Sequence, residues 1–413
     1  MTPQRFSRRA LLGGAAAGTA GLGVGAVAGW AAADDQLKPA ASLTSLRGWH
    51  GLTQPAIAER GRACTMLASF TCVAADRAAL MQMFKDLGAE AHRLCDGLSE
   101  GPLDEDSPPP TTGILGTDSS VGTSVAVSVG ASLFDHRFGL ADRKPAELVE
   151  MPYLVNDRLD PAWTHGDVLV VLAADREDQL LHGVRQIARS TREYLITNWV
   201  INGFNHIAPT DRTGHVVNRN TLGFKDGTAN LDMGGPDADF VWVAGDLNDG
   251  AEPAWTENGS YQVVRLIRTL VEQWDRASLG EQEGIIGRDK VSGAPLGLSG
   301  ESTDPDYSND PRGKRIPLDA HIRLARPRTP QTEKKRMLRK GFNYQLGFDN
   351  SGYVNQGLAF VSYQQTLDAF MTIQMRLKNE PLEEYTLPFG GGFFFALPGV
   401  QDSSDWLARP LFA

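Results

Sequence analysis

The chain has 413 residues, of which 41% are hydrophobic and 22% charged, an ordinary composition for a globular protein of one long or two medium domains. Its formal net charge of −10 argues against nucleic acid as the main partner. The three cysteines cannot all pair with one another, and neither they nor the eight histidines match a zinc or iron–sulfur signature. A disulfide framework is therefore excluded as the basis of the fold.

Residues 1–33 have the three parts of an export signal. A polar start contains Arg8 and Arg9, an Ala/Gly-rich run extends from Ala10 to Gly29, and three alanines before Asp34 offer a cleavage site. A membrane anchor is the weaker alternative, because alanine and glycine contribute little transfer energy and no second apolar span follows. We therefore expect a twin-arginine signal, no stable membrane span after its removal, and a periplasmic, cell-envelope or extracellular location. This export route carries folded proteins, commonly with a cofactor.

A polar arm over residues 34–59 precedes two units in which a strand is followed by a helix. The first has a strand over Cys64–Cys72 and helical apolar spacing over Arg77–Leu87. The second has a buried-strand run over Val168–Leu172 and a helical stretch over Gln179–Tyr194. Further strands are expected at 123–129 and 194–202, and the proline-rich stretch 104–112 is expected to be a surface loop.

The second half of the chain repeats this pattern. A strand over Ser260–Ile267 precedes helical sequence from Thr269, and a strand over Gly357–Ser362 precedes a helix over Thr366–Lys378. Four such units predict a duplicated α+β architecture with helices on one face of antiparallel sheets. With the boundary in the polar stretch near 208–220, we expect an N-terminal domain at 60–214 and a C-terminal domain at 215–413.

The segment Gly223–Asn230 (GFKDGTAN) places two glycines around Asp226. A backbone with so few side chains can approach a flat ligand closely while it presents a carboxylate. The alternative is a simple tight turn, in which glycine and aspartate are favoured for conformational reasons.

His321 lies in Leu318–Ala325, a segment whose alternation predicts a strand with Ile322 and Leu324 on one face and His321 with Arg323 on the other. Because no multi-histidine motif exists, a protein-bound iron would need a lone histidine, and an imidazole on a sheet face can bind haem iron axially. A structural histidine is the alternative.

Arg339 lies in the basic run Lys334–Lys340, which by itself indicates a solvated charged face. Residues 312–340, however, hold 11 of the 40 basic residues of an acidic chain. Such a concentration could neutralise haem propionates or steer an anionic substrate. Polyanion binding is a further alternative, but no aromatic-rich recognition module accompanies the run.

Three segments, Gly223–Asn230, His321–Arg328 and Met337–Tyr344 (MLRKGFNY), resemble in order and spacing the hallmarks of dye-decolourising peroxidases, and most closely the exported deferrochelatase/peroxidase branch. The first contains the family's G-x-x-D-G motif, the second its proximal histidine and the third its distal arginine. The segments Gly284–Lys290 and Gly293–Leu296 are also similar, so the resemblance covers nearly all of the chain after the signal.

The resemblance implies two ferredoxin-like domains in one chain, with one b-type haem in the C-terminal domain. His321 would ligate the iron, and Asp226 with Arg339 would form the catalytic pair on the opposite face. The other residues expected beside the porphyrin are Gly227, Thr228, Ala229, Arg326, Pro327 and Arg328, with Arg328 a propionate partner. Two positions depart from the pattern: Leu231 replaces a frequent proline, and Lys340 replaces a frequent arginine.

The implied function is a haem peroxidase that reduces hydrogen peroxide and oxidises organic donors such as dyes or phenols. One alternative is a deferrochelatase, which removes iron from haem and leaves the porphyrin intact. Another is a non-catalytic haem carrier, which would have no need of a carboxylate and a guanidinium at the vacant iron face. A chlorite-converting relative would lack the G-x-x-D-G motif. Assembly into a homo-oligomer is left open.

Overall fold

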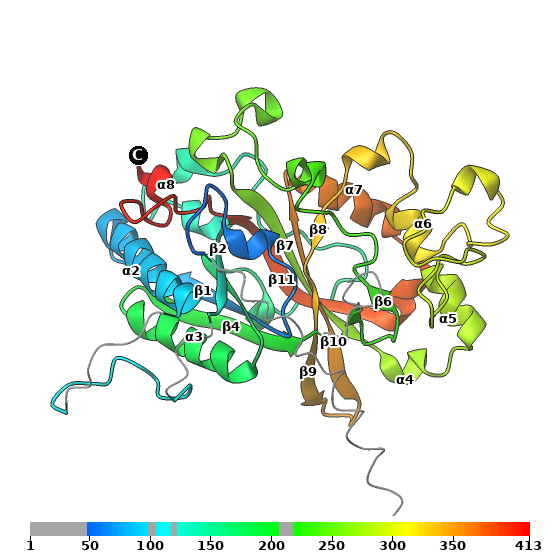
Figure 1. Ribbon diagram of the computed structural model, residues 1–413, viewed down its shortest axis with the longest axis horizontal. Helices are drawn as coiled ribbons and strands as arrows, with labels where there is room; N and C mark the ends of the chain where they lie inside the picture. Colours follow the sequence, from blue (N-terminus) through cyan, green and yellow to red (C-terminus); the bar gives the residue numbers. More distant parts are fainter. Residues whose placement is uncertain (1–47, 98–104, 117–121, 206–217) are drawn as a thin grey trace, which may run out of the picture. The chain divides into compact units, whose positions relative to one another are not determined.

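One antiparallel sheet of nine strands dominates the computed structural model, which describes residues 48–97, 105–116, 122–205 and 218–413 (Figure 1). Its strands are β1 (Cys64–Cys72), β2 (Ser124–Gly130), β3 (Val168–Ala174), β4 (Leu195–Phe204), β7 (Ser260–Thr269), β8 (Leu338–Arg339), β9 (Phe342–Phe348), β10 (Val354–Gln364) and β11 (Thr386–Ala396). They lie in the order β7-β11-β2-β3-β1-β4-β9-β10-β8, and every ladder is antiparallel. A further pairing of β7 with β10 closes the sheet into a barrel.

The helices complete two copies of one motif. They are α1 (Pro55–Ala58), α2 (Arg77–Asp96), α3 (Glu177–Ser190), α4 (Val271–Trp274), α5 (Leu279–Ile286), α6 (His321–Ala325), α7 (Leu367–Leu377) and α8 (Arg409–Phe412). The first half runs β1-α2-β2-β3-α3-β4 with sheet order β4-β1-β3-β2, and the second runs from β7 through α4–α6, β9, β10 and α7 to β11 with order β11-β7-β10-β9. Both are the ferredoxin-like arrangement, so the predicted duplicated α+β fold is confirmed.

The strand and helix predictions agree with the structure in both halves except at two places. The helix expected from Thr269 is only the single turn α4, and the chain starts a new helix, α5, where the Ser278 side chain accepts a hydrogen bond from the N–H of Glu281. The strand predicted over Leu318–Ala325 is wrong, because residues 321–325 form helix α6.

Helix α6 forms where the sequence alternates because four residues are too few to separate a period of 2 from a period of 3.6. The N–H of Leu324 donates to the Ala320 carbonyl, 3.1 Å away, as in a helix. The helix ends at Ala325, since Arg326 precedes Pro327 and the residue before a proline is disfavoured in helical conformation.

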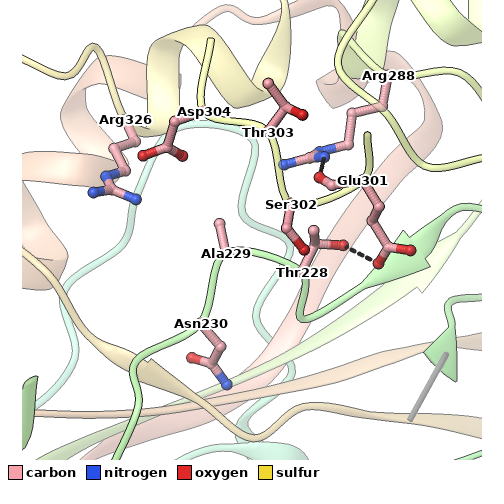
Figure 2. A pocket seen from close by; sticks show the side chains of 9 residues that line it. All are labelled: Thr228, Ala229, Asn230, Arg288, Glu301, Ser302, Thr303, Asp304 and Arg326. Atoms are coloured by element: carbon pink, nitrogen blue, oxygen red, sulfur yellow. Dashed lines mark hydrogen bonds between the residues drawn. The ribbon is translucent and has the colours of Figure 1, made fainter. Parts of the chain in front are cut away.

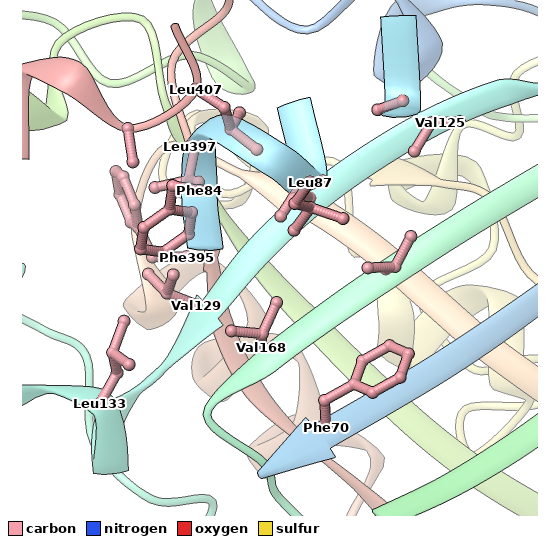
Figure 3. Packing of buried hydrophobic residues seen from close by; sticks show 14 of the residues in the cluster. Phe70, Phe84, Leu87, Val125, Val129, Leu133, Val168, Phe395, Leu397 and Leu407 are labelled. Atoms are coloured by element: carbon pink, nitrogen blue, oxygen red, sulfur yellow. The ribbon is translucent and has the colours of Figure 1, made fainter. Parts of the chain in front are cut away.

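Among the described residues, two large hydrophobic clusters lie on the two faces of the sheet, and a third, small one contains Phe224 and Trp274. Along β1, Met66, Ala68 and Phe70 face helices α2 and α3, whereas Leu67 faces the inside of the barrel with Trp199. Figure 3 shows the helix side, where Phe84 and Leu87 of α2 pack near Phe395 and Leu397 of the second half, together with Val129 and Val168. The two halves therefore share one hydrophobic core.

Helix α2 shows how local sequence builds this packing. Asp76 caps its first turn by accepting the N–H of Ala79 at 2.8 Å, and Gly97 ends it in the left-handed conformation with φ +62°. Between these ends Leu80, Phe84 and Leu87 recur at helical spacing and are fully buried.

Part of the predicted N-terminal arm belongs to the folded unit. Gln54 and Ile57 are buried, and the Gln54 carboxamide bonds both the N–H and the carbonyl of Val127 at 2.7 and 2.8 Å. The predicted signal, residues 1–33, lies outside the described residues. The domain limits 60–214 and 215–413 enclose one ferredoxin-like unit each and stay a prediction, because most of the boundary stretch is not described. Across the described residues, no helix is long and apolar enough to cross a membrane.

Lys340 joins the arm to the second half of the chain. Its ammonium donates to the carbonyls of Ala56, Ile57 and Glu59 at 2.8, 3.1 and 2.8 Å, which are the carbonyls at the end of α1. Three acceptors around one point suit a compact ammonium better than the planar fork of an arginine. The departure from the family pattern at this position is thus accommodated by the structure.

Lys340→Met should lower the free energy of unfolding by about 2–4 kcal/mol, because three carbonyls lose a charged donor. The matched control is Lys335→Met, whose ammonium pairs at the surface with Asp368 and whose loss should cost less than about 1 kcal/mol. Thermal unfolding followed by circular dichroism measures both, and equal melting temperatures for the two variants would contradict this account.

Candidate active site

Asp226 stands at the end of a small hairpin formed by β5 (Asn218–Arg219) and β6 (Lys225–Asp226). The Asn220 side chain shapes the turn by accepting the N–H groups of Leu222 and Phe224 at 3.1 and 3.2 Å. Gly227 follows with φ +86°, a conformation that side chains other than glycine rarely adopt. The G-x-x-D-G segment is therefore both a tight turn and a support that presents a carboxylate.

Arg339 meets this carboxylate from the strand β8. Its Nη1 lies 3.6 Å from Oδ1 of Asp226, with the two side chains 34% and 27% exposed. The strand β8 is attached to β10 by the pairing of Leu338 with Tyr363 and by the bond from the Lys340 N–H to the Val361 carbonyl. A carboxylate and a guanidinium that are both accessible from one side can act together on a small polar substrate.

His321 is the first residue of α6, and its Nδ1 lies 2.7 Å from Oε2 of Glu380, which is buried. Burial lowers the pKa of His321, but the charge and the hydrogen bond of Glu380 outweigh this effect, so that its pKa is raised above the usual value. The charges of Arg339 and Asp226 have smaller effects on the same pKa, the first lowering it and the second raising it. Glu380 is the partner that the sequence could not identify.

The residues present fit a haem. With Nδ1 bonded to Glu380, Nε2 of His321 has no hydrogen-bond partner among the described residues and is the ring nitrogen available for iron. Arg328 has a buried Nε without a partner in the described part of the chain, and its backbone adopts φ +59°, which is unusual for arginine. A histidine ring nitrogen without a protein partner is a group that can bind haem iron, and a guanidinium with an unpartnered N–H is a group that can bind a carboxylate such as a haem propionate.

Figure 2 shows a small polar pocket, of about 60 Å³, beside the Asp226 loop. It has room for a few water-sized molecules but not for a porphyrin. Its lining consists of Thr228, Ala229, Asn230, Arg288, Glu301, Ser302, Thr303, Asp304 and Arg326. The pocket thus places the predicted loop residues opposite two arginines.

Arg288 was not among the predicted site residues, although Gly284–Lys290 was noted as a family-like segment. Its guanidinium is buried and donates to the carbonyls of Gly293 and Glu301. Burial, and then the positive charges of Arg328 and Arg339, lower the pKa of Arg288. Through its two hydrogen bonds, Arg288 holds the backbone at Gly293 and Glu301 beside the pocket.

Six of the 11 basic residues at 312–340 form ion pairs, some with near and some with distant partners in the sequence. The ion pairs are Arg323–Asp310, Arg326–Glu333, Arg328–Asp304, Lys335–Asp368, Arg336–Asp237 and Arg339–Asp226. Most of these cations therefore hold the segments around α6 together, and this pairing weakens the interpretation of a free positive surface that steers an anionic substrate.

Comparison with known proteins agrees with this geometry. The family model described as Dyp-type peroxidase, N-terminal matches residues 54–205, and the one described as Dyp-type peroxidase, C-terminal matches residues 217–401. The chain is 44% identical over 367 residues to the deferrochelatase of Yersinia pseudotuberculosis, covering 88% of this chain and 84% of that protein. It is 45% identical over 369 residues to the deferrochelatase of Escherichia coli O157:H7, covering 88% and 86%.

Solved structures give the same result. The DyP-type peroxidase from Cellulomonas bogoriensis is 32% identical with a TM-score of 0.77, covering 88% of this chain and 96% of that one. Ferric DtpA from Streptomyces lividans is 32% identical with a TM-score of 0.79, covering 90% and 99%. Because family models match both halves and relatives match almost the whole folded unit, the chain belongs to the Dyp-type peroxidase family of haem-dependent enzymes.

Proposed function

We propose that this chain binds one haem b and reduces hydrogen peroxide while oxidising organic donors such as dyes or phenols. Two observations support the proposal: the Asp226 carboxylate pairs with the Arg339 guanidinium, and the bond of His321 Nδ1 to Glu380 leaves Nε2 available. When bound, the haem iron supplies the electron-transfer chemistry, and the protein supplies binding, orientation and charge.

Asp226 and Arg339 have complementary roles in this proposal. The Asp226 carboxylate accepts a proton from one peroxide oxygen and returns it to the other, which leaves as water. The Arg339 guanidinium donates hydrogen bonds to the oxygen that carries negative charge as the O–O bond breaks. Both groups are held on a turn and a strand, so little reorganisation accompanies the reaction.

On the other side, Glu380 accepts the Nδ1–H of His321 and orients the ring so that Nε2 is the ligand nitrogen. Gly227, Thr228 and Ala229 would pack beside the porphyrin. Arg326, Pro327 and Arg328 follow α6 directly and would border it, as the resemblance implies. Arg328 is the proposed propionate partner, because its buried Nε–H has no hydrogen-bond acceptor among the described residues.

His321→Ala should remove the axial ligand. We expect the purified variant to lose most of its bound haem or to show a changed Soret band in the ferric state, since the ring nitrogen has no substitute. The control is His92→Ala, which breaks a similar histidine–carboxylate pair, with Asp96 at 2.7 Å, on helix α2. Unchanged axial ligation in His321→Ala, observed by absorption and electron paramagnetic resonance spectra, would overturn the assignment.

Asp226→Asn should lower kcat/KM for hydrogen peroxide about 10²–10⁴-fold, the usual contribution of a positioned proton-transfer group, while haem content stays constant. Steady-state oxidation of a dye at acidic pH measures it. Asp232→Asn changes a carboxylate that caps its own loop by accepting the N–H of Gly234, and should keep the wild-type rate. Full activity of Asp226→Asn would discard the proposed proton transfer.

Deferrochelation is a second candidate function, favoured by the names of the relatives at 44–45% identity. Both activities would use the same pocket. Incubation of the protein with haem in the absence of peroxide, followed by a fluorescence assay for free protoporphyrin, separates them. Metal-free porphyrin formed in proportion to enzyme concentration would support deferrochelation. If none forms, deferrochelation is rejected and peroxidase activity is the function that the site supports.

Export is part of the proposal. The predicted twin-arginine signal at residues 1–33 supports transport of the folded, haem-loaded protein to the periplasm, the cell envelope or the medium. Hydrogen peroxide and an organic donor or haem would be its partners there. Assembly into a homo-oligomer stays open.

A further inference from the structure

The side chain of Asn230 makes an unusual pair of hydrogen bonds to the backbone of Arg339. Its Nδ2 donates to the Arg339 carbonyl at 2.7 Å, and its Oδ1 accepts the Arg339 N–H at 2.8 Å. The carboxamide therefore occupies the place that a neighbouring strand would take beside Arg339. Figure 2 shows the Asn230 carboxamide turned away from Arg288 and Arg326 of the pocket.

The geometry of β8 explains why this contact matters. On its other edge, Leu338 and Arg339 pair with Tyr363 and Ser362 of β10, and the N–H of Lys340 donates to the Val361 carbonyl at 2.7 Å. This register makes Arg339 and Ser362 a non-hydrogen-bonded pair, so both backbone polar groups of Arg339 point away from β10. Among the described residues, Asn230 is the group that meets them.

Asn230 also belongs to the loop that carries Asp226. Its own N–H donates to the Gly227 carbonyl at 3.1 Å, and nearby Glu301 accepts from Lys225 and Thr228 at 2.5 and 2.9 Å. The loop is thus held on both sides of Asp226, and its last residue is attached to Arg339.

We propose that Asn230 is a positioning residue that fixes the Arg339 guanidinium relative to the Asp226 carboxylate. The inference rests on the roles proposed above for these two side chains. Without the two bonds, the two-residue strand β8 is held on one edge only, and the 3.6 Å separation of the pair is no longer imposed by the loop.

Two substitutions test this. Asn230→Ala removes both bonds and should lower kcat/KM for peroxide at least about tenfold, because small displacements of a catalytic group have large effects on rate. KM for the organic donor and haem content should stay at wild-type values. The affinity of the ferric protein for fluoride, an anion on the Arg339 side, should weaken by a similar factor, which gives a readout independent of turnover.

Asn230→Asp is the sharper variant. A protonated carboxyl can still donate to the Arg339 carbonyl and accept its N–H, whereas a carboxylate cannot donate and is repelled by the carbonyl oxygen. The ratio of variant to wild-type kcat/KM should therefore approach one at low pH and fall to the level of Asn230→Ala as the pH rises through the pKa of the new carboxyl. The charged groups near the new carboxyl are Arg288, Glu301, Asp304 and Arg326, which line the pocket, together with Asp226 and Arg339. Asn230→Ala measured over the same pH range is the reference, because it lacks the two bonds and adds no charge.

The matched control is Gln54→Glu. The Gln54 carboxamide makes the same two hydrogen bonds, to the N–H and the carbonyl of Val127 on β2. Its substitution should therefore lower the melting temperature without changing kcat/KM for peroxide or fluoride affinity. A pH-independent ratio for Asn230→Asp, or wild-type rate and fluoride affinity in Asn230→Ala, would overturn the positioning role. Should Asp226→Asn prove fully active, the proposed function itself fails, and the two failures are thereby distinguished.

Discussion

The site depends on the pairing of strand β7, which has β10 on one edge and β11 on the other. Each of these two strands is connected to a segment that carries a site residue. One edge holds β10, to which β8 and hence Arg339 are attached. The other edge holds β11, which begins six residues after Glu380. The same pairing of β7 with β10 closes the barrel. The backbone hydrogen bonds of β7 therefore both close the barrel and position the segments that carry Arg339 and Glu380.

The elements that present the reactive groups are too short to be stable alone. Asp226 ends a two-residue strand, Arg339 ends another, and His321 begins a five-residue helix. Side-chain to backbone bonds hold each of them: Asn220 for the Asp226 turn and Asn230 for Arg339. For the helix, the Asp310 carboxylate accepts the N–H groups of Lys314, Arg315 and Ile316, and Arg323 donates to the Asp310 and Ile316 carbonyls. Such a site has little secondary structure, and side-chain hydrogen bonds to the backbone replace the missing ladders.

Electrostatics divides the site into two unlike sides. Around His321, one buried carboxylate raises the pKa of the imidazole and sets its orientation. Around Arg288, burial and then the charges of Arg328 and Arg339 lower the pKa of the guanidinium. The neighbouring arginines Arg326 and Arg328 are paired with Glu333 and Asp304, so most of the positive charge on this side is neutralised within the protein.

The sequence by itself determined the duplicated α+β pattern, the turn that presents Asp226, and the family to which His321 and Arg339 belong. These follow from local periodicity, from glycine conformations and from short motifs. It assigned α6 to a strand, since four alternating residues carry no unique period. Glu380, Arg288 and the bond between Asn230 and Arg339 were decided by the tertiary structure alone. Glu380 lies 59 residues from His321, and Asn230 lies 109 residues from Arg339, so only the closed barrel brings these groups within hydrogen-bond distance.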